Sequence, residues 1–155
     1  MDAGEEDDPR STLEGPALRL TLAGFVPFAL LAVWLVAIAN DHVWRDDTIL
    51  LLKVYGATIL SFLGGARFGI ALMAGGEEQR LPLAASVIPA LCAWVACSIG
   101  EPGSFALLAV AFAAQGAWDS VSSHRGDMPG WYGRMRVVIT GMVVLVMILA
   151  FVETA

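Results

Sequence analysis

Residues 50–74 read LLLKVYGATILSFLGGARFGIALMA, an apolar run whose only charged residues are Lys53 and Arg67. A helix that crosses a bilayer needs about 20 residues of this kind. Four further apolar runs accompany it, at 17–39, 81–99, 104–121 and 132–152. Hydrophobic residues make up 57% of the chain and charged residues only 15%, against roughly 45–50% and 25% in soluble domains. The sequence therefore predicts an all-α integral membrane protein, a bundle of five transmembrane helices.

The third run contains a proline in its interior. Pro89 lies within 81–99 and is expected to kink that helix. Separately from this kink, a four-helix alternative, in which 81–99 re-enters the membrane instead of spanning it, stays open. In either case residues 17–155 form one membrane domain.

The distribution of arginine predicts an orientation. With five spans, one side of the membrane carries most of the basic residues: Arg10, Arg19, Arg80, Arg125, Arg134 and Arg136. The opposite side carries Arg45 and Lys53. Cytoplasmic connections are enriched in Lys and Arg. The N-terminus is therefore predicted to be cytoplasmic and the C-terminus outside.

The first sixteen residues are acidic. Between Asp2 and Asp8 the chain holds five acids and no base, part of a formal net charge of −6. Such a segment is too polar to pack, so residues 1–16 are predicted to be a disordered tail. A docking role for this tail is the alternative. No basic patch indicates nucleic acid as a partner.

Two faces of the 50–74 helix differ in composition. Small residues recur every fourth position along one face: Ala57, Ser61, Gly65 and Gly69. Small residues at this spacing let helices approach closely in lipid, here by packing within the chain or at a dimer seam. The former is favoured. A second face runs from Lys53 through Gly64 to Arg67, so this helix is predicted to contact neighbours on both sides and to be central.

Arg67 is a charge within a span and is expected to have a partner. The best candidate is Asp119, which shares a helix stripe with Gln115 at i, i+4 spacing. Antiparallel threading places Arg67 and Asp119 in the same leaflet. They form either a structural ion pair or a polar site for an anionic or amphipathic ligand.

Aromatic and basic residues gather where the last run begins. Trp131, Tyr132, Arg134 and Arg136 form what we call the interfacial collar. Such a collar suits the membrane interface and can bind anionic lipid headgroups.

The segment from Tyr55 to Gly69 resembles the signature of the transmembrane protein 69-like family, a family defined as a domain of unknown function. Asp119, the stretch Met128–Tyr132, Met135–Arg136 and Thr140 resemble its second pattern. The chain departs from the family at Phe68, where Trp is common, and at Met135, where Leu is usual. Membership implies a multi-span protein of bacterial or mitochondrial inner membranes and no defined activity.

Three functions are compatible with these features. The first is a scaffold or assembly partner in a membrane complex, or a homo-oligomer. The second is a small oligomeric transporter or channel with Arg67 and Asp119 along its path, and the third is a lipid- or quinone-handling enzyme. No nucleotide, zinc or hydrolase motif occurs in the sequence, so an enzyme is disfavoured and neither cofactor nor metal is predicted.

Overall fold

A computed structural model describes residues 14–124 and 130–155, and the described chain is helical without strands. The helices are α1 (Glu14–Ala37), α2 (Arg45–Ala74), α3 (Arg80–Ala85), α4 (Ile88–Ser98), α5 (Gly103–His124) and α6 (Gly130–Thr154), and the 3-10 turn η2 (Glu77–Gln79) precedes α3. Five segments are long and apolar enough to cross a membrane, with α3 and α4 forming one of them. The prediction of an all-α bundle of five transmembrane helices is confirmed.

Several helices begin earlier than the apolar runs. Helix α1 starts at Glu14, within the predicted tail, and residues 1–13 of that tail lie outside the described residues. Helix α2 starts at Arg45 rather than at residue 50, with Asp46 and Asp47 in its first turn. Acidic side chains there are stabilised by the helix dipole. Hydropathy marks the part of a helix that lies in lipid and misses such polar first turns.

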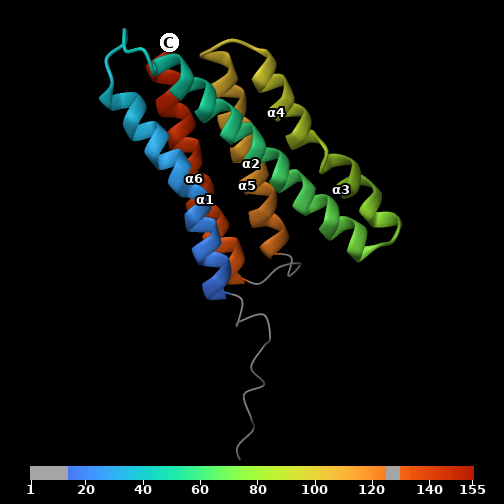
Figure 1. Ribbon diagram of the computed structural model, residues 1–155. Coiled ribbons are helices and arrows are strands. Elements are labelled where there is room, and N and C mark those ends of the chain that lie inside the picture. Colours follow the sequence, from blue (N-terminus) through green and yellow to red (C-terminus); the bar gives the residue numbers. More distant parts are fainter. Residues whose placement is uncertain (1–13, 125–129) are drawn as a thin grey trace, which may run out of the picture.

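The third span is broken in the middle. Helix α3 ends at Ala85 and α4 begins at Ile88, with Pro89 in its first turn. The two pieces continue in one direction along α2 (Figure 1). Together Glu77–Ser98 has the length and hydropathy of a span, which does not fit the re-entrant alternative. The kink expected near Pro89 is present as this break.

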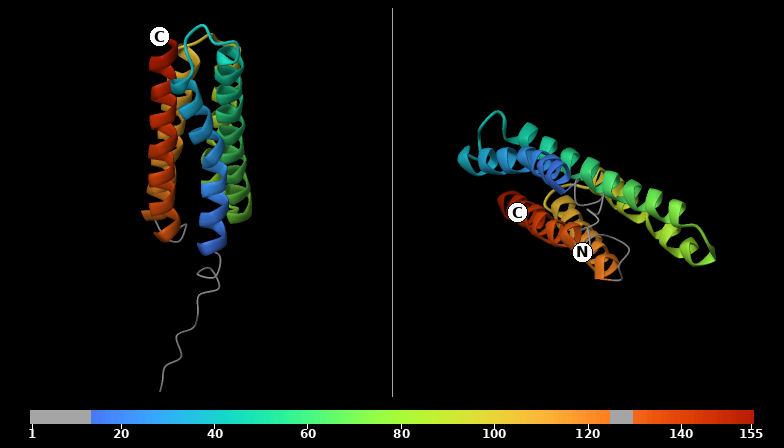
Figure 2. Two further views of the ribbon diagram at one scale, coloured as in Figure 1. Left: turned by 60° about the vertical axis from the view of Figure 1, so that its left-hand side comes forward. Right: turned by 90° about the horizontal axis from the view of Figure 1, so that it is seen from below.

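Helix α2 contacts α1, α3, α4 and α5, while α6 packs against α1 and α5. The left-hand view of Figure 2 shows the helices running roughly side by side, and the right-hand view, from below, shows α2 and the third span spread away from the other helices at one end. The buried core draws on α1, α2, α4, α5 and α6, with Phe28, Leu60, Phe112 and Met147 among its largest members. The predicted central position of the second helix agrees with these contacts.

The connections divide between two ends of the bundle. The start of α1 and the α2–α3 connection lie at one end, and the α1–α2 connection and the C-terminus lie at the other (Figure 1). We call them the N-terminal end and the C-terminal end. At the N-terminal end, α2 and α3 diverge from α1 (Figure 1).

Candidate functional site: a buried carboxylate between two arginines

Three helices each contribute one charged side chain to a cluster toward the N-terminal end. Arg67 of α2 donates from Nε to Asp119 Oδ1 of α5 at 2.7 Å. Arg136 of α6 donates from Nε to Asp119 Oδ2 at 2.8 Å. Each guanidinium also has Nη2 at 2.7 Å from the same oxygen. The arginine side chains are 8% exposed and that of Asp119 5%, so the cluster is buried.

Neighbours on α5 fix the two ends of the Arg67–Asp119 pair. Gln115 donates from Nε2 to Asp119 Oδ1 at 3.3 Å, and Arg67 donates from Nη1 to Ser122 Oγ at 2.9 Å. The Arg67 guanidinium lies 5.0 Å from the ring centroid of Trp118, a distance at which the ring attracts a cation. The stripe predicted on α5 thus faces Arg67, and Trp118 adds to it.

Close packing of α5 against α6 brings Arg136 to the cluster. A Cβ at Gly116 would lie 2.5 Å from Thr140 Cγ2, so only glycine allows this approach. A Cβ at Gly133 of α6 would likewise lie 2.3 Å from Ser123 Oγ of α5. These two contacts lie on either side of the Asp119–Arg136 pair in the sequence and hold the two helices at a short distance around it.

The hydrogen bonding of the cluster is incomplete. Within the described part of the chain, Nη2 of Arg67, Nη2 of Arg136 and Oε1 of Gln115 are buried without a hydrogen-bond partner. The Nη2 atoms are close to Asp119 but poorly aligned with it. Two guanidiniums face one carboxylate, so these three side chains sum to one positive charge. Arginine stays protonated in proteins, which suits anion binding and excludes a role as a general base.

Three cavities reach the cluster. A groove of about 390 Å³ between α1, α2 and α6 ends at Tyr132 and Arg136, and we call it the α1–α2–α6 groove. A second cavity, of about 310 Å³, lies between the third span and α5 and reaches Gln115. A third, of about 460 Å³, reaches Arg67 and has Glu78 in its lining. The cluster is therefore buried but accessible from more than one direction.

The position of Arg136 differs from the one predicted for it in the interfacial collar. The sequence placed it among headgroup-facing residues, whereas the structure buries it against Asp119. Of the other three, Arg134 is exposed, and Trp131 and Tyr132 are half-buried with their rings 5.9 Å apart. The side chain of an arginine near the start of a spanning helix can extend toward the headgroups or toward the core of the bundle. The helices packed around it determine which of the two directions it takes.

The small-residue ridge of α2 is covered along only part of its length. Ala57 is buried in the core and Ser61 is half-buried. Gly65 is exposed, and a Cβ at Gly65 or Gly69 would meet nothing within 4 Å. Packing within the chain is therefore wrong for this half of the ridge. The close approach occurs instead at Gly64, where a Cβ would lie 2.7 Å from the Ser86 carbonyl oxygen.

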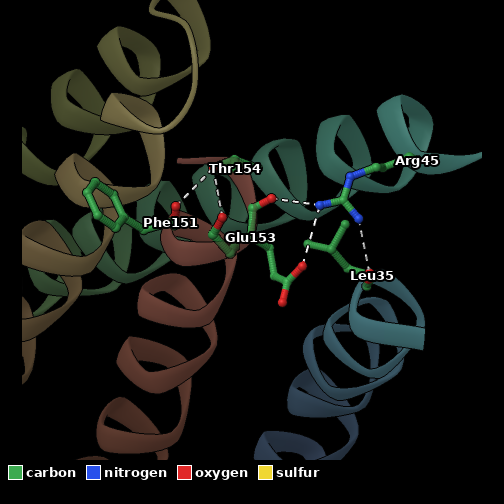
Figure 3. A network of polar contacts seen from close by, with 6 residues as sticks. Leu35, Arg45, Phe151, Glu153 and Thr154 are labelled. Atoms are coloured by element: carbon green, nitrogen blue, oxygen red, sulfur yellow. Dashed lines mark hydrogen bonds and ion pairs between the residues drawn. The ribbon is translucent and has the colours of Figure 1, made fainter. Parts of the chain in front are cut away.

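Two further ion pairs lie at the C-terminal end, and the sequence did not identify them. Arg45 contacts Glu153 at 3.4 Å and donates to the backbone oxygens of Glu153 and Leu35 (Figure 3). Lys53 contacts Glu101 at 2.5 Å. Hydrogen bonding from Lys53 lowers the pKa of the Glu101 carboxyl. Among the residues described, no cluster of His, Cys, Asp and Glu could hold a metal ion.

The family model for a protein of unknown function, DUF3429, matches residues 13–152. The chain belongs to the DUF3429 family. This member is 28% identical to Transmembrane protein 69 of Xenopus tropicalis over 142 residues and 30% identical to that of Mus musculus over 141. Each alignment covers 90% of this chain and 55% of the relative, so the DUF3429 chain spans about half the length of those relatives. No solved structure matches it.

Family membership confirms the resemblance drawn from Tyr55–Gly69 and Asp119–Thr140. It also agrees with a multi-span membrane protein, since the relatives are named as transmembrane proteins. Part of the second pattern, residues 128–129, lies outside the described residues. The three charged residues of the cluster all fall within the matched region.

Proposed function

We propose that this protein binds an anionic group at the Arg67–Asp119–Arg136 cluster. The observation that carries the proposal is the charge count: two buried guanidiniums share one carboxylate. A structural ion pair needs one arginine for one carboxylate. A second buried arginine adds a desolvation cost that an anion would offset.

Binding agrees with the geometry better than conduction through a single chain does. Between the cluster and the Lys53–Glu101 pair, the core is filled by apolar side chains, among them Leu60 and Phe112. A path for ions along the bundle would have to pass this layer. The transporter alternative therefore needs a rearrangement or an oligomer, whereas anion binding needs neither.

The test uses purified protein in a mild detergent. Inorganic phosphate at constant ionic strength should raise the unfolding temperature relative to chloride, because a ligand that binds only the folded state stabilises it. R67Q and R136Q should each reduce that increase. Arg19 is exposed on α1, so R19Q is the matched control and should behave like wild type. No phosphate effect in wild type, or an equal effect in R136Q, would overturn the proposal.

A second candidate function is that of a scaffold or assembly partner, which the open half of the α2 ridge supports. Gly65 is exposed and Gly69 half-buried, and a Cβ at either position would meet nothing within 4 Å. Small residues with such open space favour close contact with another helix. G65L should dissociate a copurifying complex or homo-oligomer. Gly141 of α6 is equally open, so G141L is the control. A lone monomer in native membrane extracts would contradict this function.

The proposal extends to topology and location. The predicted orientation places the N-terminal end of the bundle, with the Arg67–Asp119–Arg136 cluster, toward the cytoplasm. A bacterial inner membrane, or the mitochondrial inner membrane in a eukaryote, fits the family resemblance. Reporter fusions at both termini test the orientation, and fractionation of the native cell tests the membrane.

A further inference from the structure

We infer that the anionic group bound by the cluster is the headgroup phosphate of an anionic membrane phospholipid, with an acyl chain in the α1–α2–α6 groove. This inference rests on the proposed anion binding and adds the identity and the direction of approach of the ligand. Its main observation is one cavity that joins a long apolar wall to a buried arginine, which shares its single carboxylate partner with a second arginine.

The wall of the groove suits a hydrocarbon chain. Its lining is mostly apolar, with Phe25, Ile59, Phe62, Ile139 and Val143 among the residues that form it. The cavity of about 390 Å³ lies within the range of roughly 300–1,000 Å³ that is typical of small-molecule sites. No acidic side chain occurs among its described lining residues. The groove therefore offers an acyl chain apolar contact without repelling an anionic head.

The polar end of the groove suits a phosphate. Arg136 lines it and is 7% exposed, and its buried Nη2 lies 2.7 Å from Asp119 Oδ2 without an aligned hydrogen bond in the described chain. Tyr132 lines the same end, one helical turn before Arg136. A guanidinium with an unused N–H donor forms short charge-assisted hydrogen bonds to phosphate oxygens. The site thus has a cationic donor where the head of a lipid would lie.

The depth of Arg136 fits a lipid head. It lies five residues after Trp131, where the last span begins, which is about 7.5 Å along the helix. The span itself has 24 residues, or about 36 Å, against a hydrocarbon core of about 30 Å. The Arg136 backbone is therefore only a few ångströms inside the edge of the hydrocarbon core, and a long arginine side chain there can reach toward the headgroup layer.

The two ways to the cluster differ in charge and surroundings. Leu20 and Phe62 line the groove and are 74% and 68% exposed on spanning helices, so the groove opens toward the bilayer. The cavity that reaches Arg67 is lined by η2 residues at the aqueous end, including the carboxylate of Glu78. A soluble anion would have to pass that carboxylate. Approach from the bilayer avoids it, which favours a lipid.

Gly24 provides a way to fill the groove without removing a charge. It lines the groove, and a Cβ there would meet nothing within 4 Å. In G24L the side chain should occupy the space of the acyl chain and leave the cluster intact. G141L adds the same side chain at another open glycine, on α6, and serves as the control.

The experiment combines native mass spectrometry with reconstitution of delipidated protein. Wild type should retain phosphatidylglycerol over phosphatidylcholine by about ten-fold or more, the effect of one charge-assisted contact. R136Q should lose this preference. G24L should lose retention of both lipids yet keep the stabilisation by inorganic phosphate. G141L should match wild type, and circular dichroism confirms that each variant is folded.

Each other outcome is decisive. Phosphate stabilisation without preferential lipid retention would overturn the lipid inference and leave the proposed anion binding standing. Undiminished retention in both G24L and R136Q would also overturn it, because the lipid would then lie elsewhere. Absence of both lipid and phosphate effects in wild type would overturn the inference and the proposed function together.

Discussion

Replacing Asp119 by asparagine tests whether one carboxylate holds three helices together. D119N keeps the size of the side chain but removes the negative charge that the structure places against Arg67 and Arg136. Both guanidiniums remain charged and 8% exposed. Removing one partner of a buried ion pair costs about 3–5 kcal/mol. Because Asp119 serves two arginines, we expect a loss at the upper end of that range.

The matched comparison is R136Q, which leaves the Arg67–Asp119 pair intact and neutral. It removes the excess charge together with one hydrogen-bond donor, so we expect a smaller loss of about 1–3 kcal/mol. The double variant D119N/R136Q should lose less than the sum of the two single variants, because each single change disrupts the same contact.

The assay is reversible unfolding in mixed detergent micelles, followed by circular dichroism. R19Q, at an exposed position on α1, should change the free energy of unfolding by no more than about 0.5 kcal/mol. A loss in D119N no larger than that in R136Q would refute the reasoning. So would exact additivity in the double variant, because it would mean that the two residues act independently.

The remaining predictions concern packing, pH and topology. G64A should lose about 1–3 kcal/mol by overpacking, because its Cβ would lie 2.7 Å from the Ser86 carbonyl oxygen, whereas G65A should be neutral in thermal unfolding. The Lys53 contact lowers the pKa of Glu101 from 4.5, so its contribution of about 1 kcal/mol is present above that pH. It should be lost as pH falls through the lowered value, and E101Q should show no such loss in unfolding experiments. Reporters at the two termini should lie on opposite sides of the membrane, with the N-terminal reporter in the cytoplasm.

Hydropathy and helix threading predicted much of this fold. Each span is an apolar run of the right length, so the number of helices follows from the sequence. The pairing of Arg67 with Asp119 follows too, because antiparallel spans place both in one leaflet. The break in the third span was partly predictable, since Pro89 limits the backbone there. Helix starts were less predictable, because acidic first turns such as Asp46–Asp47 lie outside the apolar runs.

The sequence could not determine which faces are covered. The ridge from Ala57 to Gly69 has one composition along its length, yet its first part is buried and Gly65 is exposed. One reason is that a row at every fourth position drifts by about 40° per step around an α-helix, so Gly65 lies about 80° around α2 from Ala57. Which face a neighbouring helix covers also depends on the crossing angle, and that angle is set by the side chains of both helices. The composition of one helix alone therefore does not determine it. Arg136 was misplaced for a related reason: the signal that α5 and α6 approach closely is Gly116 opposite Thr140, a contact between distant positions.

The two ends of the bundle differ in charge balance, and this difference bears on the role of the cluster. At the C-terminal end Arg45 pairs with Glu153 and Lys53 with Glu101, so those charges cancel. A buried ion pair that serves only to fix helix positions needs one basic side chain for each carboxylate. The N-terminal cluster lacks this balance, because two guanidiniums share the single carboxylate of Asp119. A second arginine there is explained more simply by an anion that it binds than by the helices that it joins.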